Sequence, residues 1–212
     1  MRSRDASSDL LPARAVGVLA KVCVCLYFVM LAAVNLRYFQ TTGTLSSLGL
    51  VLVSLLIVVL FVARRERGEL SERPLHWCIG FVATVLPLLF RPGPPGNEVQ
   101  ILCGDTIQIL GLAVTMLALV SLQRSFGIVP ANRGVRTLGL YRFVRHPLYA
   151  GELSFLLGYA LANPSAWNLA LWAIEISLQC ARVRFEEGFL DRDPDYRRYR
   201  ERVRCRFIPG VL

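Results

Sequence analysis

The chain has 212 residues, of which 54% are hydrophobic and only 18% are charged. So few charged groups could hardly cover the surface of a water-soluble domain, so the composition favours a membrane protein. The net charge of +9 admits nucleic acid or anionic lipid as a partner, but lipid is the nearer polyanion for a chain in a bilayer. We therefore expect membrane lipids, and no nucleic acid, as partners.

Cysteine and histidine usage points away from a metal centre. The six cysteines are scattered without a Cys-x-x-Cys pair, and the chain has only two histidines. Structural zinc sites need such ligands at close and regular spacings. We predict no metal site and no disulfide framework.

Four apolar stretches of helical length occupy the first half of the chain, after a polar tail at 1–14. Spanning a hydrocarbon core of about 30 Å takes about 20 residues at about 1.5 Å each. All but the third stretch are long enough outright, and the third can span where the bilayer thins. We read the first as a retained anchor because no cleavage site follows it. The stretches lie at about 15–36, 44–63, 75–90 and 100–122, which gives spanning helices within 15–122.

A helical hairpin is predicted over 148–184. Asn163-Pro164-Ser165 interrupts its apolar run with a helix stop and a new start. The two arms carry Glu152 and Glu175, and carboxylates within a membrane rarely face lipid. We expect the hairpin to pack against protein.

Arginines in the connecting segments orient the chain. Cytoplasmic loops retain lysine and arginine, and short loops decide the topology. We therefore expect a protein of the inner membrane whose N-terminus lies in the cytoplasm. The residues after the fourth stretch, 123–212, should form a module that faces the cytoplasm. The arginines concerned are Arg2, Arg4 and Arg14, then Arg64, Arg65, Arg67 and Arg73, then Arg124, Arg133, Arg136, Arg142 and Arg145, against Arg37 and Arg91 alone on the other side.

The basic stretch 193–209 places Tyr196, Tyr199 and Val203 at helical spacing. Such a pattern is typical of an amphipathic helix at the interface, with aromatic residues on the bilayer and arginines toward anionic headgroups. The predicted fold is thus all-α: a polytopic bundle of about four spanning helices, the hairpin and an interfacial helix.

Two clusters could carry chemistry. In Arg145-His146-Pro147-Leu148-Tyr149 a proline can open a helix at its first turn, where unpaired backbone N–H groups suit a carboxylate or phosphate. The alternative is plain interfacial anchoring by Arg and Tyr. Arg182 and Glu186 are four residues apart and share a helix face. They could form a simple ion pair, or hold an anion and a cationic amine respectively.

In this order, after a set of spanning helices, the clusters resemble the superfamily of isoprenylcysteine carboxyl methyltransferases and phospholipid methyltransferases, which are integral membrane enzymes. The resemblance covers about 120–210. Its marks are Gly139-Leu-Tyr141-Arg, Arg145-His-Pro-Leu-Tyr-Ala-Gly151, Glu186-Glu187-Gly-Phe-Leu190, and Tyr196-x-x-Tyr199-x-x-x-Val203 running into Ile208-Pro209.

The resemblance implies a cytoplasmic pocket for S-adenosylmethionine, open to the membrane, with S-adenosylhomocysteine as product. The implied cofactor contacts are Arg133, Gly134, Val135 and Arg136 through their backbone, and Tyr141, His146, Pro147, Leu148, Tyr149 and Glu186, the last on the amino group. The implied catalytic residues are Arg182 and Glu187, and the substrate contacts are Arg182, Arg145 and Arg202.

Arg182 favours O-methylation of a carboxylate on a lipophilic or prenylated substrate, which needs no catalytic base. One alternative is N-methylation of a phospholipid amine, with Glu187 or Glu152 taking the proton. A second is an NADPH-dependent sterol-type reductase, although those proteins carry an Asn where this chain has Leu148. The third is a lipid-binding protein without catalysis.

Overall fold

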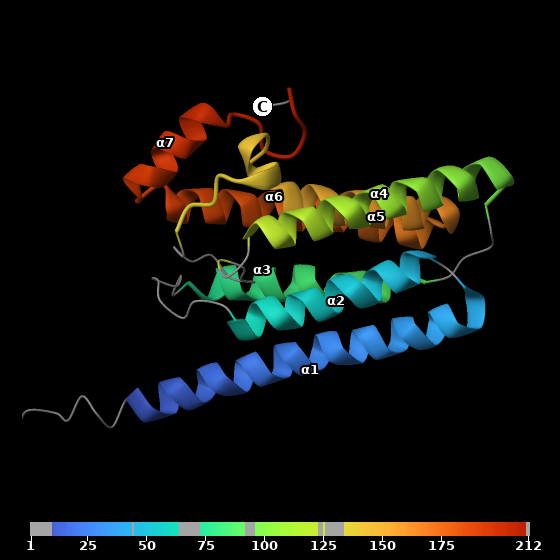
Figure 1. Cartoon of the computed structure of the whole chain (residues 1–212), viewed down its shortest axis with the longest axis horizontal. Helices are drawn as coiled ribbons and strands as arrows, with labels where there is room; N and C mark the ends of the chain where they lie inside the picture. The colour runs from blue at the N-terminus through green and yellow to red at the C-terminus, as the bar shows by residue number, and fades with distance from the viewer. Residues whose placement is uncertain are drawn as a thin grey trace, which may run out of the picture. The chain divides into compact units, whose positions relative to one another are not determined.

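The computed structural model describes residues 10–43, 45–63, 73–91, 96–122, 125 and 134–210. Over these residues every regular element is a helix, which confirms the all-α prediction. The chain divides into two compact units, 1–63 and 64–212. Figure 1 gives the helix labels used below.

The first unit is a pair of packed helices, α1 (Leu10–Thr42) and α2 (Leu45–Ala63). Gly43 follows α1 with a φ of 69°, a left-handed conformation that commonly ends a helix. The outer side chains of α1 stay apolar, with Met30 68% and Val34 65% exposed. An apolar exposed surface of this kind is what lipid contact requires.

Two helices among the described residues are long and apolar enough to cross a bilayer, within Lys21–Thr41 and Glu98–Leu122. The stretches Ser47–Ala63 and Pro74–Leu89 are shorter. In the second of these, α3 (Pro74–Val85) gives way to a 3-10 turn, η1 (Leu86–Leu89), because a proline inside a helix removes a hydrogen bond. Two of the four predicted spanning helices therefore meet the required length. That the other two also span the membrane remains a prediction.

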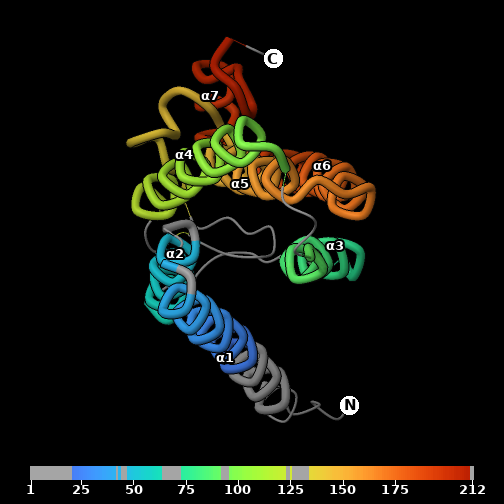
Figure 2. The backbone as a smooth tube through the Cα atoms, turned by 90° about the vertical axis from the view of Figure 1, so that its right-hand side faces the viewer, coloured from blue at the N-terminus to red at the C-terminus, as the bar shows by residue number. Residues whose placement is uncertain are grey.

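Helices α4 (Glu98–Leu122) and α5 (Pro147–Ala162) of the second unit are in close backbone contact (Figure 2). A Cβ atom added to Gly104 would lie 2.7 Å from the carbonyl oxygen of Gly158. One added to Gly158 would lie 2.6 Å from the backbone nitrogen of Gln108. Membrane helices that associate in this way gain van der Waals contact because small residues let the backbones meet.

We expect Gly158→Ala to destabilise the protein by about 1–3 kcal/mol, because the new methyl group would overlap the backbone of α4. Gly188→Ala is the matched control. Its Cβ meets nothing within 4 Å, so the higher helix propensity of alanine should stabilise α6 by up to about 1 kcal/mol. Unfolding free energies in detergent would test both, and equal effects would refute the packing argument.

Helix α6 (Ala166–Leu190) follows α5 through the predicted interruption. The Ser165 hydroxyl accepts a hydrogen bond from Asn168 N at 3.1 Å and caps the helix. The fully buried Asn168 side chain in turn donates to the carbonyls of Asn163 and Arg91, both at 2.9 Å. The predicted hairpin is therefore formed, and its turn is fastened to the end of the segment that carries η1.

The short helix α7 (Pro194–Arg202) begins where Asp193 accepts a hydrogen bond from the backbone nitrogen of Asp195 at 2.8 Å. The helix was predicted, but the prediction that its aromatic face lies on the bilayer is wrong. Tyr196 and Tyr199 are 4% and 3% exposed and form a cluster with Val203. The aromatic face is covered by protein, including Val135 and Leu190.

Candidate functional site

The segment before α5 is shaped by a glycine and a proline. Gly139 opens the 3-10 turn η3 (Gly139–Arg142) with a φ of 62°, and a Cβ there would collide with the Ser121 hydroxyl. Pro147 occupies the first turn of α5, where its fixed φ suits a helix start. His146 precedes it without a side-chain cap. The first backbone N–H groups of α5 are thus left for other partners.

Residues 203–206, which we call the C-terminal strap, pair with this segment through the backbone. Arg145 N donates to Cys205 O and His146 N to Arg206 O, both at 2.9 Å. The Arg145 side chain continues the pairing, since Nη1 lies 2.8 Å from Val203 O and 2.6 Å from Arg204 O. These contacts favour a structural role for Arg145 over the substrate contact predicted from the sequence.

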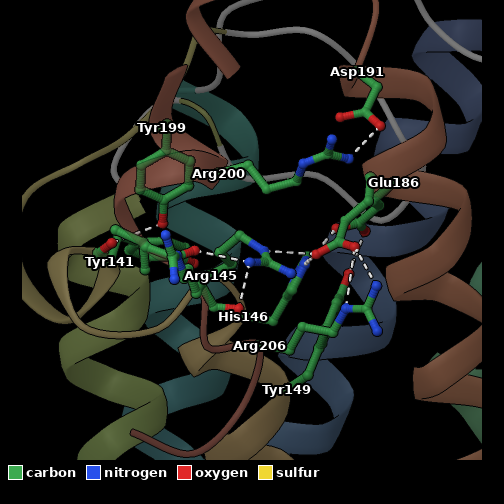
Figure 3. Close-up of polar contacts among 12 residues, drawn as sticks. Tyr141, Arg145, His146, Tyr149, Glu186, Asp191, Tyr199, Arg200 and Arg206 are labelled. Atoms are coloured by element: carbon green, nitrogen blue, oxygen red, sulfur yellow. Dashed lines mark hydrogen bonds and ion pairs between the residues drawn. The ribbon is translucent and has the colours of Figure 1, made fainter. Parts of the chain in front are cut away.

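The Glu187 carboxylate joins the strap to the start of α5. Figure 3 shows its partners Arg145, His146 and Arg206 close together. The carboxylate lies 2.8 Å from Arg145 Nε, 3.2 Å from His146 Nε2 and 3.0 Å from Arg206 Nη2. Burial alone would raise the pKa of Glu187, but hydrogen bonds from His146, Arg206 and Arg145 lower it to about 2. We call these four residues the Glu187 cluster.

Glu186 makes different contacts from its neighbour. The Tyr149 hydroxyl donates a hydrogen bond to Glu186 Oε1, and Glu186 Oε2 lies 3.9 Å from His146 Nδ1. The rings of His146 and Tyr149 are stacked, with centroids 5.8 Å apart. The side chain of Glu186 is 19% exposed, against 7% for Glu187. Of the two carboxylates, Glu186 is therefore the one more open to a ligand.

A polar stripe continues along the same face of α6. The Arg182 guanidinium lies 4.7 Å from the centre of the Tyr149 ring, and Arg182 Nη1 lies 3.4 Å from Gln179 Oε1. Gln179 Nε2 then donates to Glu152 Oε2 at 3.0 Å and to Glu175 Oε1 at 2.7 Å. Positions 175, 179, 182 and 186 follow the three- and four-residue spacing of one helix face.

Two tyrosines of α7 cluster with Val203 of the strap, and they differ in their hydrogen bonding. The Tyr199 hydroxyl donates to Tyr141 O at 2.7 Å, whereas the Tyr196 hydroxyl is buried without a hydrogen-bond partner among the described residues. Burial raises the pKa of Tyr141 well above its ordinary value, and the nearby Glu186 adds to this. All three side chains therefore stay neutral phenols, since burial raises the pKa of Tyr196 and Tyr199 as well.

We expect Tyr199→Phe to cost about 1–2 kcal/mol of unfolding free energy, because the buried carbonyl of Tyr141 loses its donor. Tyr196→Phe removes the same atom from the same helix, but no hydrogen bond is lost with it. We expect that variant to be neutral or slightly stabilising. Thermal unfolding of the two proteins side by side tests this difference, and a larger cost at Tyr196 would contradict it.

The structure brings together the two clusters that the sequence analysis singled out, because the start of α5 contacts the Arg182/Glu186 face of α6. The residues brought together are Arg145, His146, Tyr149, Arg182, Glu186 and Glu187. Sequence reasoning missed Arg206 and Gln179. A single arginine in a basic tail carries no signal, whereas Gln179 at helical spacing from Glu175 and Arg182 could have been found.

Other predicted contacts are placed elsewhere or lie outside the described residues. Val135 packs against the tyrosine cluster of α7, and Arg136 Nε donates to Ser125 Oγ at 2.9 Å. Arg202 is exposed on α7, with Nε 3.4 Å from Arg198 O. Arg133 lies outside the described residues, as does half of the set of arginines used for the topology prediction.

Comparison with known proteins gives one finding. Residues 99–193 match the model of the phospholipid methyltransferase family. The match runs from the second residue of α4 to the residue before α7, and so includes the start of α5 and both glutamates of α6. No curated protein matches the chain. The resemblance inferred from the motifs is confirmed over this segment.

Proposed function

We propose that the protein transfers a methyl group from S-adenosylmethionine to a membrane lipid, on the basis of the match of residues 99–193 to the phospholipid methyltransferase family. The observation that carries the proposal is the meeting of Glu186 with the uncapped start of α5. The partly exposed Glu186 carboxylate contacts the side chain of Tyr149 in the first turn of α5 and lies 3.9 Å from Nδ1 of His146, the residue before that helix. Opposite charges on one small ligand would satisfy both the carboxylate and the N–H groups at the helix start.

The side chains at this point fit the amino acid end of the cofactor. S-adenosylmethionine carries an ammonium and a carboxylate on one carbon atom. Glu186 would accept hydrogen bonds from the ammonium group, and the N–H groups of Leu148 and Tyr149 would suit the carboxylate. Tyr149 orients Glu186 through its hydroxyl. His146 and Pro147 would line the same place, as the motif resemblance implies.

Glu187 suits the role of a positioning residue better than that of a catalytic base. Three cationic or hydrogen-bonding side chains lower its pKa to about 2, so it is a weak proton acceptor at neutral pH. Its contacts fix the backbone turn that carries His146 and the helix that carries Glu186. We propose this role for Glu187 in place of the catalytic one that the resemblance implies.

The chemistry asks for alignment more than for acids and bases. When bound, the cofactor would supply a methyl group on a sulfonium, whose bond to sulfur would break as a lone pair of the acceptor forms the new bond. The contribution of the protein is to hold donor and acceptor in line and to exclude water. A carboxylate acceptor is ready to react, whereas an ammonium group must first lose a proton.

The surroundings of Arg182 support an amine as the acceptor. Carboxylate recognition by this residue was the reason to favour O-methylation. Glu152, Glu175 and Glu186 all act on its charge, however, so much of that charge is already balanced. A phospholipid amine is therefore the better supported substrate, and a prenylated or other lipophilic carboxylate is the second candidate because Arg182 adjoins Tyr149.

The test is transfer of a labelled methyl group by the purified protein in nanodiscs that contain phosphatidylethanolamine or a prenylcysteine. Base-stable label in the phospholipid would support the amine substrate, and base-labile volatile label would mark an ester. Thermal shifts with S-adenosylhomocysteine and NADP test the class of enzyme. Stabilisation by NADP alone would favour a reductase, and stabilisation by neither would favour a lipid-binding protein without catalysis.

We further propose that the site faces the cytoplasm at the inner membrane, with the N-terminus on the same side. The support is the placement of arginines in alternate connections. Cys205 lies in the C-terminal strap beside the site, so a membrane-impermeant thiol reagent can report on it. A variant that keeps Cys205 alone should react in inverted vesicles and be protected in intact cells.

A further inference from the structure

Two carboxylates in the hairpin are joined by one amide. Gln179 Nε2 donates to Glu152 Oε2 at 3.0 Å and to Glu175 Oε1 at 2.7 Å. Glu175 and Gln179 are completely buried. Within the described residues, Glu175 Oε2 is a buried oxygen without a hydrogen-bond partner. Buried carboxylate oxygens are nearly always paired, so this one calls for an explanation.

The acidic groups of this part of the hairpin outnumber the cations that act on them. Glu152 and Glu175 bring two acidic groups, and Arg182 brings the cation that acts on both. In a medium of low dielectric, a guanidinium balances one carboxylate. The second carboxylate is then left to hold a proton or to face a positive charge from outside the protein.

The acidic pair is connected to the proposed methyl-transfer site. Arg182 Nη1 lies 3.4 Å from Gln179 Oε1, and its guanidinium stacks on the Tyr149 ring. Tyr149 in turn bonds to Glu186. The charged group that acts on the pair is thus Arg182 on α6. Tyr149 on α5 and Glu186 on α6 act in turn on Arg182.

We propose that Glu152 and Glu175 determine the charge class of the acceptor. By balancing Arg182 they make this part of the hairpin favour a cationic amine headgroup and disfavour a carboxylate. The inference rests on the proposed methyl transfer to a lipid, and it adds two residues that select the substrate. Neither residue needs to touch the transferred methyl group, because the selection acts through charge.

The alternative is that the pair only stabilises the hairpin. Both readings predict some loss of stability when an acid is replaced, so stability cannot separate them. Selectivity can, because only the first reading predicts a reversal of preference. Glu152→Gln and Glu175→Gln keep the shape of the side chain and one acceptor oxygen, but the amide cannot carry a negative charge.

The experiment measures binding of two probes with equal chains, dodecylamine and dodecanoate, to the purified protein by thermal shift at neutral pH. We expect the unaltered protein to prefer the amine. At least one of the two single variants should shift the ratio of the two apparent affinities by about tenfold toward the carboxylate, which corresponds to about 1.4 kcal/mol. Glu201→Gln, which removes an exposed acid from α7, should leave the ratio unchanged.

Affinity for S-adenosylhomocysteine, measured on the same proteins, separates this inference from the proposed function. Unchanged affinity with a shifted ratio supports both. A shifted ratio in a protein that does not bind S-adenosylhomocysteine supports charge selection and refutes methyl transfer. An unshifted ratio in both single variants overturns charge selection whatever the cofactor result, and two independent variants guard against misfolding of one.

Discussion

Glu186→Gln should weaken the binding of S-adenosylhomocysteine by about 10–100-fold, since a charge-assisted hydrogen bond contributes about 1.5–3 kcal/mol. The amide can still accept the hydrogen bond from Tyr149, so the local geometry is kept. What disappears is the negative charge offered to the ammonium group of the ligand. Calorimetry on the detergent-solubilised protein measures the effect directly.

Tyr149→Phe tests whether the orientation of the Glu186 carboxylate matters separately from its charge. It removes the hydroxyl that bonds Glu186 but leaves the ring on which Arg182 stacks. We expect a smaller loss of affinity than for Glu186→Gln. Glu201→Gln is the control for a change in total charge. Equal affinities in all three variants would show that Glu186 does not contact the cofactor.

Glu187→Gln should destabilise the C-terminal strap by about 3–5 kcal/mol, because it leaves the buried guanidinium of Arg145 without its carboxylate partner. The backbone carbonyls of Val203 and Arg204 would still hold Arg145. We therefore expect only the strap, and not the whole protein, to become less stable. Hydrogen exchange of residues 203–206, compared with that of α4, measures it, and uniform loss of protection would point to global unfolding instead.

The same carboxylate gives the strap a pH dependence with a defined sign. The pKa of Glu187 is lowered from its ordinary 4.5 to about 2. The stabilisation is then fully present above about pH 4.5 and is lost as the pH falls toward 2. Protection of the strap should fall over this interval in the unaltered protein, and Glu187→Gln should lack that dependence. Asp195→Asn, which removes a partner from an exposed ion pair with Arg198, should keep it.

Much of the fold was predictable because the lengths of the apolar runs and the positions of helix-breaking residues determine it. Apolar runs near 20 residues can only be helices in a bilayer. Asn163-Pro164-Ser165 interrupts one of them and indeed joins α5 to α6. The close approach of α4 and α5 was less visible. Gly104 and Gly158 lie far apart in the sequence, and only the folded chain shows that their backbones meet.

The orientation of α7 shows the limit of periodicity. Spacing at Tyr196, Tyr199 and Val203 identifies an apolar face but not what covers that face. Lipid and protein are equally good apolar partners by this criterion. In the structure this face is covered by protein, and Tyr199 also donates a hydrogen bond to the Tyr141 carbonyl.

The roles of the two adjacent glutamates were equally hidden. On a helix, neighbouring side chains point in directions about 100° apart, so Glu186 and Glu187 face different partners. The partners of Glu187 include Arg206, which comes from a tail crowded with arginines. Sequence alone gives no reason to single out that one. Such pairing across the chain is a tertiary property.

The C-terminal strap has a consequence for choosing a minimal fragment. The family match ends at residue 193, yet Arg145 depends on backbone oxygens at 203 and 204 and His146 on one at 206. In a polypeptide that ends at residue 193, the buried Arg145 guanidinium would lose its two carbonyl acceptors. Any autonomous version of this enzyme-like region must therefore extend through Arg206.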